Sequence, residues 1–413
     1  MKRVVITGMG TINPLGNNVA DYWSNLLKGV SGAGPITRFD ASKFKTKFAC
    51  EVKDYDPADH FERNELKKYD LYSQFALISS GQAIEQSGLL ASGFDAERAG
   101  VIWGSGNGGI TTLEEQITAF ATGDGTPRYS PFLVPRMIVN MAPGLLSIKY
   151  GFKGLNFATV SACTASNNAV MDAVNYIRWG VVDVMLAGGS EAPVTTSSIG
   201  GFNSMKALST RNDAPQKASR PFDKDRDGFV LGEGGGAFVL ESYEHAIERG
   251  AIILAEIAGV AMTSDAYHIT ATHPDGDGAY RAMNMALKDA GVTIADIDYI
   301  NAHATSTGVG DPSELNAITR LLQDTDVQLD ISATKSMTGH LLGAAGIIES
   351  ITCVNSILHG LIPPTINLEN PEDVDNRINI VAGTPNAKVI NTCLNNTSGF
   401  GGHNAMIVFK KVV

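Results

Sequence analysis

Segments typical of strands and helices alternate along this chain, and the alternation starts afresh near residue 250. Before that point, short apolar runs predict strands over residues 4–7, 101–103, 157–161, 182–187 and 236–240. Helical spacing of apolar residues predicts helices over residues 71–86, 143–150 and 164–179. Helices that alternate with strands are typical of an α/β protein, in which the helices cover the faces of a sheet.

A second series follows residue 250. It predicts strands over residues 254–260, 299–302 and 405–410, and helices over residues 279–290, 313–322 and 339–358. Each series contains a turn rich in Ser or Thr, a helix of small residues that ends in glycine at Gly180 or Gly360, and then an extended run. We therefore expect two similar α/β halves, residues 1–250 and 251–413, although this echo alone does not establish a duplication.

Cys163 lies at a predicted strand-to-helix turn. Residues 155–162 are typical of a buried strand, and the predicted helix begins directly after Thr164. A helix N-terminus has free N–H groups and a partial positive charge, and both lower the pKa of a thiol from its free value of about 8.5. Most buried cysteines only fill space, so this position by itself leaves a reactive and an inert thiol both open.

Three further motifs follow Cys163 along the chain. His303 lies in the run from Asn301 to Asp311, and His340 lies in a glycine-rich run over residues 335–346. The last motif is Gly-Phe-Gly-Gly-His-Asn over residues 399–404. Either histidine alone is more often structural than catalytic. The four motifs together, in this order, are highly specific.

On these motifs, and over residues 4–410, the chain resembles the decarboxylating β-ketoacyl-acyl-carrier-protein synthases. It is most similar to the type II elongating branch, whose site is Cys-His-His. The resemblance implies an α/β, thiolase-like fold with five layers, α-β-α-β-α, and a pseudo-twofold axis. It also implies an acyltransferase that joins an acyl chain to malonyl-acyl-carrier protein by decarboxylative Claisen condensation, in fatty-acid elongation.

The resemblance implies a role for each motif. Cys163 would hold the acyl chain as a thioester, and the backbone N–H groups of Cys163 and Phe400 would stabilise the tetrahedral intermediate. His303 and His340 would donate hydrogen bonds to the enolate oxygen that forms when carbon dioxide leaves.

Four more residues have roles by resemblance. Lys335 and Glu349 would fix charge and orientation around His340, although a buried ion pair with no further role is the alternative. Thr305 and Thr307 would bind the phosphopantetheine arm, and simple turn chemistry is the alternative for this pair.

Basic side chains are expected to bind the carrier protein, because carrier proteins are acidic. Lys67 and Lys68 cluster with Arg63 in one segment, and Lys206 with Arg211 forms a second cluster. The matching positions near residues 67, 68 and 206 are basic docking residues in the family. An ordinary solvated charged face is the alternative.

Departures from the family pattern concentrate around the expected acyl cavity. Asn107 stands where a large aliphatic residue is usual, Ser398 where phenylalanine is usual, and Arg136 where a small hydroxylic residue is usual. A buried polar group without a partner costs about 1–3 kcal/mol, so a substrate that is not a plain saturated chain is one candidate partner for these groups. The alternative to fatty-acid elongation is therefore a specialised synthase that builds an aryl-polyene or polyketide-like chain.

Other enzyme classes fit the residues less well. Thiolases use a second cysteine as base, but neither Cys353 nor Cys393 lies in a second-nucleophile motif. A non-catalytic chain-length-factor subunit would lack the nucleophile that Cys163 supplies. A Cys-His hydrolase would need a water route and a carboxylate that orients its base, and two donor histidines fit decarboxylative condensation better.

Composition is consistent with a soluble enzyme. With 44% hydrophobic and 18% charged residues, the chain is typical of a globular protein, and a net charge of −11 argues against nucleic acid as the main partner. Its four cysteines have no metal-binding spacing and are expected to be reduced, as in the cytoplasm. No stretch reads as the roughly 18 apolar residues of a transmembrane helix, so we expect no membrane insertion.

Partners and cofactors follow from the resemblance. We expect no metal and no organic cofactor in the chemistry, because phosphopantetheine arrives on the acyl carrier protein. A homodimer is expected, and pairing with a non-catalytic homologue stays open.

Overall fold

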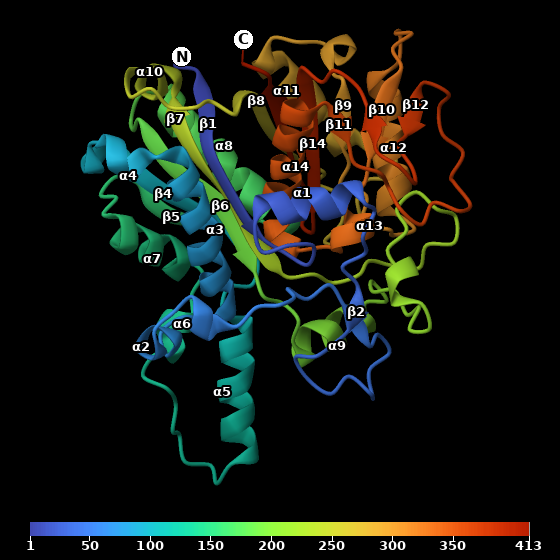
Figure 1. Cartoon of the computed structure of the whole chain (residues 1–413). Helices are drawn as coiled ribbons and strands as arrows, with labels where there is room; N and C mark the ends of the chain where they lie inside the picture. Colours follow the sequence, from blue (N-terminus) through green and yellow to red (C-terminus); the bar gives the residue numbers. More distant parts are fainter. Residues whose placement is uncertain (413) are drawn as a thin grey trace.

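One mixed sheet runs through the whole molecule (Figure 1). The computed structural model describes residues 1–412, and the strand order of this sheet in them is β12-β10-β9-β14-β15-β8-β1-β7-β6-β4-β5. The strands before residue 250 are β1 (Val4–Ile12), β4 (Ala99–Gly104), β5 (Asn156–Thr159), β6 (Val184–Glu191) and β7 (Gly234–Ser242). Those after it are β8 (Ala255–Ser264), β9 (Tyr299–Asn301), β10 (Leu329–Ser332), β12 (Ile378–Ile380), β14 (Thr392–Gly399) and β15 (His403–Lys410).

The two halves of the sheet repeat the same strand order and directions. In the first half, β5, β4 and β6 are parallel, and β7 and then β1 each run antiparallel to the preceding strand. In the second half, β10, β9 and β14 are parallel, and β15 and β8 follow in the same way. The first strands of the halves, β1 and β8, pair antiparallel in the middle of the sheet. This repeat supports our proposal that the chain divides near residue 250.

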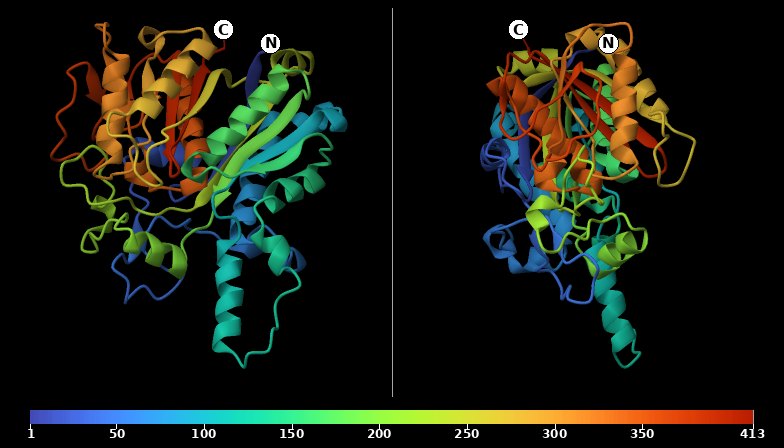
Figure 2. Two further views of the ribbon diagram at one scale, coloured as in Figure 1. Left: turned by 180° about the vertical axis from the view of Figure 1, so that it is seen from behind. Right: turned by 90° about the vertical axis from the view of Figure 1, so that its right-hand side faces the viewer.

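Helices form layers between and outside the two halves of the sheet (Figures 1 and 2). The inner layer is α8 (Ala165–Arg178) and α14 (Ala345–His359), which contact each other and the sheet. On the outside, α3 (Leu71–Ser87) and α7 (Met141–Tyr150) cover the first half, and α11 (Asp277–Ala290) and α12 (Gly310–Leu321) cover the second. This is the α-β-α-β-α arrangement of the thiolase-like fold, so the predicted fold class is confirmed.

Apart from one helix of 13 residues, α5, the remaining elements are shorter than the helices of these layers. The other α-helices are α1 (Val19–Leu27), α2 (Arg63–Leu66), α4 (Leu89–Ser92), α5 (Ile110–Thr122), α6 (Leu133–Met137), α9 (Thr196–Ser204), α10 (Tyr243–Glu248) and α13 (Lys335–Thr338). The 3-10 turns are η1 (Pro57–Asp59), η2 (Ala96–Arg98), η3 (Ala162–Thr164), η4 (Pro215–Lys217), η5 (Ile294–Asp296) and η6 (Leu342–Ala344). Two small two-stranded sheets pair β2 (Gly34–Pro35) with β3 (Phe48–Ala49) and β11 (Leu361–Ile362) with β13 (Asn386–Ala387).

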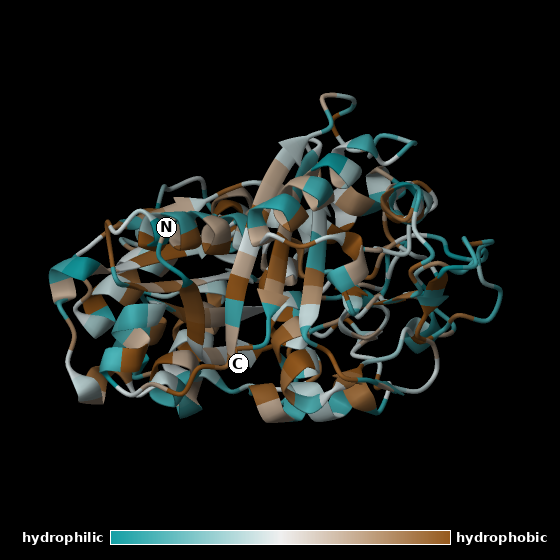
Figure 3. Ribbon diagram, turned by 90° about the horizontal axis from the view of Figure 1, so that it is seen from above, coloured by the Kyte–Doolittle hydropathy of each residue, from teal (hydrophilic) through white to brown (hydrophobic). Residues whose placement is uncertain are grey.

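The core lies where the inner helices meet the sheet. Figure 3 shows much of the apolar colour in the strands and helices at the middle of the molecule, whereas many outer loops are polar. The segment Leu342–His359 is long and apolar enough to cross a membrane, contrary to the prediction that no stretch would be. However, 89% of it is buried inside the protein, so packing in the core accounts for its hydropathy.

Three local expectations differ from the structure. The helix expected from residue 339 begins at Ala345, because the backbone of His340 is paired with a neighbouring segment and 3-10 turn η6 follows. The strand expected to be buried over residues 155–162 is β5, which lies at the edge of the sheet and is partly exposed. Helix α5, which the sequence did not predict, projects from the body of the protein (Figure 2).

Candidate functional site

Cys163 lies in a tight turn between β5 and α8. It is the middle residue of η3, and Ala162 before it has φ = +51°, a conformation that is uncommon for a residue with a side chain. The thiol is only 7% exposed. Strained backbone of this kind is often found at functional sites, and here it places the thiol at the N-terminus of a buried helix.

Burial dominates the protonation of this thiol. It raises the pKa of Cys163 to about 12, more than the positive charge of Lys335 and the backbone N–H groups of Phe400 and Cys163 lower it. The prediction that the helix N-terminus would lower this pKa is therefore wrong for the free protein. At neutral pH the thiol is protonated, and its reaction as a nucleophile requires a nearby group that accepts the proton.

His340 contacts the thiol. Its Nε2 lies 3.1 Å from Sγ of Cys163. Its ring packs edge-on against the ring of Phe229, with 5.4 Å between centroids and 83° between planes. Burial, and then the charge of Lys335, hold the pKa of His340 well below its usual value. The imidazole is thus neutral and able to accept the thiol proton.

His303 lies beside His340, with 5.3 Å between ring centroids and 86° between ring planes. Nζ of Lys335 is 3.2 Å from Nδ1 of His303. An ammonium group can only donate, so Nδ1 accepts and the ring proton is on Nε2. Burial, followed by the charges of Lys335 and His340, lowers the pKa of His303 well below its usual value. His303 is therefore a neutral donor through Nε2.

The buried pair Lys335–Glu349 serves a different histidine from the one predicted. We expected it around His340, but Lys335 hydrogen-bonds His303 and forms an ion pair with Glu349. Both side chains of the pair are 1% exposed. Burial raises the pKa of Glu349 to about 7, although the charge of Lys335 opposes this. His340 feels the charge of Lys335 but receives no hydrogen bond from it.

The glycine-rich loop after β14 passes directly over the turn that contains Cys163. A Cβ atom on Gly399 would lie 3.1 Å from the backbone N of Cys163 and 3.2 Å from the carbonyl oxygen of Ser161. Gly401 and Gly402 have φ of +88° and +77°, which disfavour other residues. This close approach brings the N–H of Phe400 to the thiol beside the N–H of Cys163, as an oxyanion site requires.

A cavity of about 650 Å³ opens in front of these groups, within the usual range of about 300–1,000 Å³ for ligand sites. It brings together most of the predicted site residues, namely Cys163, His303, His340, Thr305, Thr307, Asn107, Ser398, Phe400 and Lys206. The hydroxyls of Thr305 and Thr307 are 3.1 Å apart. Lys335 and Glu349 lie behind the histidines and do not line the cavity.

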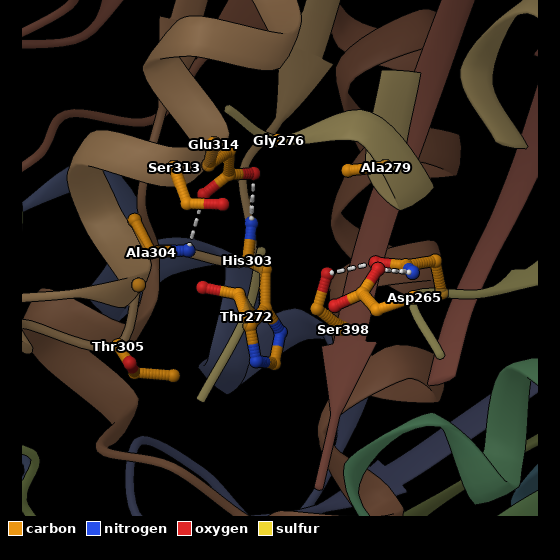
Figure 4. Close-up of a pocket in the computed structure, with 12 residues that line it drawn as sticks. Asp265, Thr272, Gly276, Ala279, His303, Ala304, Thr305, Ser313, Glu314 and Ser398 are labelled. Carbon is orange, nitrogen blue, oxygen red and sulfur yellow. Dashed lines mark hydrogen bonds between the residues drawn. The ribbon is translucent and has the colours of Figure 1, made fainter. Parts of the chain in front are cut away.

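The polar residues of the cavity wall already have partners. Asn107 Nδ2 donates to Glu191 at 2.8 Å, and Ser398 Oγ donates to Asn404 at 2.9 Å. Figure 4 shows Ser398 in this hydrogen-bonded group, in which Asn404 also donates to Asp265 at 2.7 Å. Of the partners that the sequence left open for Asn107 and Ser398, the protein itself supplies these, and a polar substrate is not needed to satisfy them.

Arg136 does not line this cavity, contrary to expectation. It lies in α6, where its charge lowers the pKa of the carboxyl groups of Asp70 and Glu115, which burial raises. The neighbouring helix α5 contains Glu115 and packs against α6. Arg136 thus lies where α6 packs against the projecting helix α5.

The predicted docking residues lie in different places. Lys206 is exposed at the rim of the cavity. Lys67 and Lys68 are exposed next to α2, and neither lines the cavity. Arg211 is half-buried and donates to the carbonyl oxygen of Asp225 at 2.9 Å, so part of its guanidinium is already engaged.

Sequence reasoning missed Glu314, which fixes the backbone at His303. Its carboxylate accepts from the N–H groups of His303 and Ala304, both at 2.7 Å (Figure 4). Burial raises the pKa of Glu314 to about 7. A signal existed, because Asp311 and Glu314 fall on the same stripe of α12 as buried Ile318. Carboxylates on the buried stripe of a helix indicate a structural or functional network.

Within residues 1–412, no group of three or more His, Cys, Asp or Glu side chains is arranged to hold a metal ion.

Comparison with known proteins agrees with this geometry. Residues 1–246 match the family model of the β-ketoacyl synthase N-terminal domain, and residues 254–369 match that of the C-terminal domain. A protein of Synechocystis named 3-oxoacyl-[acyl-carrier-protein] synthase 2 is 49% identical over 99% of this chain and 98% of that protein. One of the same name from Coxiella burnetii is 47% identical over 100% of this chain and 99% of that protein.

Solved structures show the same fold. A β-ketoacyl synthase from Burkholderia phymatum has a TM-score of 0.92 and 32% identity, with both chains fully covered. A type II polyketide ketosynthase, solved in complex with its acyl-carrier protein, has a TM-score of 0.90 and 35% identity, again with full coverage. The chain therefore belongs to the β-ketoacyl synthase family, which confirms the resemblance seen in its motifs.

Proposed function

We propose that this protein elongates fatty acids by condensing an acyl chain, held on Cys163, with malonyl-acyl-carrier protein. The product is β-ketoacyl-acyl-carrier protein, and carbon dioxide is released. The observation that carries the proposal is the contact of Cys163 Sγ with His340 Nε2 at 3.1 Å, with His303 beside it in the same cavity. Relatives named 3-oxoacyl-[acyl-carrier-protein] synthase 2, at 45–49% identity over nearly full length, support it.

The first step transfers the acyl chain to the enzyme. As Sγ of Cys163 attacks the acyl-carrier thioester, its proton passes to Nε2 of His340. The N–H groups of Cys163 and Phe400 stabilise the oxyanion of the tetrahedral intermediate. When this intermediate collapses, the carrier thiolate leaves and takes the proton, so the acyl-enzyme forms with His340 neutral again.

The second step makes the carbon nucleophile. Malonyl-carrier loses carbon dioxide, and the electrons of the broken bond form an enolate whose oxygen accepts hydrogen bonds from His303 and, once its ring proton has moved from Nδ1 to Nε2, from His340. The enolate carbon attacks the thioester on Cys163, and as the tetrahedral intermediate collapses Cys163 leaves as a thiolate, which takes up a proton from water. Lys335 keeps the proton of His303 on Nε2, which makes this ring a donor at the moment when negative charge develops.

The carrier protein delivers both substrates. Thr305 and Thr307 contact the phosphopantetheine arm, which reaches the cavity on the carrier, so no resident cofactor takes part. Lys206 at the cavity rim, with Lys67, Lys68 and the free part of Arg211, binds the acidic carrier. A solved ketosynthase with its acyl-carrier protein supports this partner class.

The functional unit is a cytoplasmic homodimer. Strand β5 leaves one edge of the sheet unpaired and partly exposed, and Val160 next to it is 61% exposed. The projecting helix α5 exposes Ile117 and Phe120, which a second copy would cover. Sedimentation of the purified protein tests this homodimer against a monomer that pairs with a second, non-catalytic chain. The alternative is suggested by a solved ketosynthase in complex with its chain-length factor.

The alternatives are not favoured. Solved ketosynthases from a type II polyketide system or in complex with a chain-length factor are 25–35% identical to this chain, whereas the relatives named 3-oxoacyl-[acyl-carrier-protein] synthase 2 are 45–49% identical. Asn107 and Ser398 have partners within the protein, so nothing in the wall requires a polar chain. The presence of Cys163 argues against a non-catalytic chain-length factor, and two donor histidines argue against a hydrolase.

Mass spectrometry tests the proposal. The wild type, incubated with acyl-carrier proteins that bear saturated chains of different lengths, should gain one acyl group at Cys163. The Cys163→Ala variant should gain none. A labelled acyl-enzyme that persists in Cys163→Ala, or a wild type that stays unmodified with every carrier, would contradict the proposal.

A further inference from the structure

The backbone of His340 is held on both sides by one neighbouring segment. Its N–H donates to the carbonyl oxygen of Val230 at 2.7 Å, and its carbonyl oxygen accepts from the N–H of Gly232 at 2.9 Å. The same segment carries Phe229, whose ring packs against the imidazole. The position of the imidazole therefore follows the position of residues 229–232.

These two segments are packed without free space. A Cβ atom on Gly232 would lie 2.9 Å from a methyl group of Leu341 and 3.0 Å from the carbonyl oxygen of Thr338. A Cβ atom on Gly339, whose φ is +68°, would lie 2.9 Å from the carbonyl oxygen of Val230. Because protein interiors are close-packed, a shift of residues 229–232 is transmitted to His340.

A third segment holds residues 229–233 from the other side. The N–H of Cys50 donates to Leu231 at 2.8 Å, and the N–H of Glu233 donates to the carbonyl oxygen of Cys50 at 3.1 Å. The side chain of Glu233 then accepts from the N–H of Val52 at 3.0 Å and forms an ion pair with Arg38. Glu233 thus connects residues 229–232, which hydrogen-bond the backbone of His340, to the loop around residues 38–52.

The ion pair between Arg38 and Glu233 is the charged contact between residues 229–233 and this loop. The side chain of Glu233 is 1% exposed and that of Arg38 is 33% exposed. The N–H of Arg38 also bonds the buried carboxylate of Glu51, which accepts from Thr37 as well. Burial raises the pKa of Glu233, and the charge and hydrogen bond of Arg38 oppose this, so Arg38 favours the charged form of Glu233 at this place.

We propose that Arg38 and Glu233 are positioning residues for His340: their ion pair fixes residues 229–233, and this segment sets the distance from the imidazole to the thiol of Cys163. The inference rests on the proposed function, in which His340 accepts the thiol proton and later donates to the enolate. Neither Arg38 nor Glu233 lines the cavity, so each acts through His340 and not on the substrate.

Glu233→Gln tests the proposal, because it keeps the size of the side chain and removes its charge. The measured quantity is the rate of Cys163 alkylation by iodoacetamide between pH 6 and 10, in four proteins: wild type, Glu233→Gln, His340→Ala and the double variant. A misplacement of about 1 Å can cost about 10²-fold in rate. We expect Glu233→Gln to slow alkylation near pH 8 by about tenfold and to change its pH profile, and to add less than about twofold in the His340→Ala background.

A buried ion pair elsewhere provides the control. Glu241 is 0% exposed, pairs with Arg249, and lies roughly 26 Å further along β7 at about 3.3 Å per residue. Glu241→Gln should lower the melting temperature and leave the alkylation profile unchanged. If Glu233→Gln does not fold, Arg38→Lys replaces it, because lysine keeps the positive charge but lacks the planar guanidinium. We expect this variant to slow alkylation of Cys163 by a smaller factor than Glu233→Gln.

The outcomes are distinct. An alkylation profile of Glu233→Gln equal to wild type, or an equal loss with and without His340, would overturn the positioning role while the proposed function stands. A wild type alkylated no faster than Cys163→Ala would defeat the proposed function, and the positioning role with it.

Discussion

The contact between Lys335 and His303 determines which ring nitrogen of His303 can donate a hydrogen bond. The ammonium Nζ lies 3.2 Å from Nδ1 of His303, and it can only donate. The same charge helps to keep the pKa of both histidines low, so the rings stay neutral in the pH range in which enzymes work. A neutral ring with its proton on Nε2 is the form that can stabilise an enolate.

Lys335→Met removes this donor. The tautomer of His303 is then no longer set, and the pKa of each histidine should rise because a nearby positive charge is lost. We expect condensation to fall by about 10²-fold, as for other lost donors to a developing oxyanion, while acylation of Cys163 changes only a few-fold. Radioactive carbon dioxide released from labelled malonyl-carrier measures the effect.

Lys388→Met is the matched control for Lys335→Met, because Lys388 also pairs with a carboxylate, that of Asp330 at 2.9 Å, but does not line the cavity. It should leave carbon dioxide release unchanged. If both lysine variants lose activity equally, the contact with His303 has no special role.

The reactivity of Cys163 should depend steeply on pH. Its pKa is raised to about 12, so the thiolate fraction at pH 7 is smaller than for a free cysteine of pKa about 8.5. Below the pKa, each pH unit increases the thiolate roughly tenfold, so the rate of alkylation by iodoacetamide should climb from pH 7 to pH 10 without a plateau. A plateau at or below pH 8 would show that burial does not dominate.

Lys206→Glu should weaken use of carrier-bound substrates and spare small pantetheine thioesters, because the residue is exposed at the cavity rim. The difference should shrink as salt rises, since exposed charges are screened over about 8–10 Å at 0.1–0.15 M. The Lys288→Glu variant has the same charge change at an exposed position of α11 and should behave as wild type. Equal losses on both kinds of substrate would exclude a docking role for Lys206.

Asn107→Ile removes a hydrogen bond to a buried carboxylate. Glu191 keeps its bonds from Ser105 and from backbone N–H groups, so the protein should fold but lose about 1.5–3 kcal/mol of unfolding free energy. Urea unfolding measures this loss. Because Asn107 is satisfied by Glu191 and not by substrate, the wild type should already prefer saturated chains over polyunsaturated chains of equal length. A wild type that prefers polyunsaturated chains would instead support a synthase that builds an aryl-polyene or polyketide-like chain.

The order of the elements could be predicted because each has a local signal. Helix α3 was predicted over residues 71–86 and spans Leu71–Ser87, and strand β1 begins at Val4 as expected. The arrival of Cys163, His303 and His340 in one cavity has no local signal, since 140 residues separate the first from the second. For these residues the prediction depended on motifs known from a family.

Long-range contacts and burial account for the remaining differences. Nothing in the residues near Lys335 indicates that it serves His303 and not His340, because only the fold sets that contact. The pKa of Cys163 was misjudged because a helix N-terminus is visible in sequence, whereas complete burial is not. Helix α5 was missed although Ile110, Leu113, Ile117 and Phe120 recur at helical spacing along it; only the fold shows that Ile117 and Phe120 of this helix are exposed.

The most direct test of the account separates acylation from condensation in one variant. Intact-mass spectrometry would follow His303→Ala and wild type, first with acyl-carrier protein and then after malonyl-carrier is added. We predict that both proteins gain the acyl group on Cys163. After malonyl-carrier is added, the wild type should lose this group as β-ketoacyl-carrier appears, whereas His303→Ala should retain it about 10²–10³ times longer. An acyl-enzyme of His303→Ala that is discharged into β-ketoacyl-carrier at the wild-type rate would contradict the account.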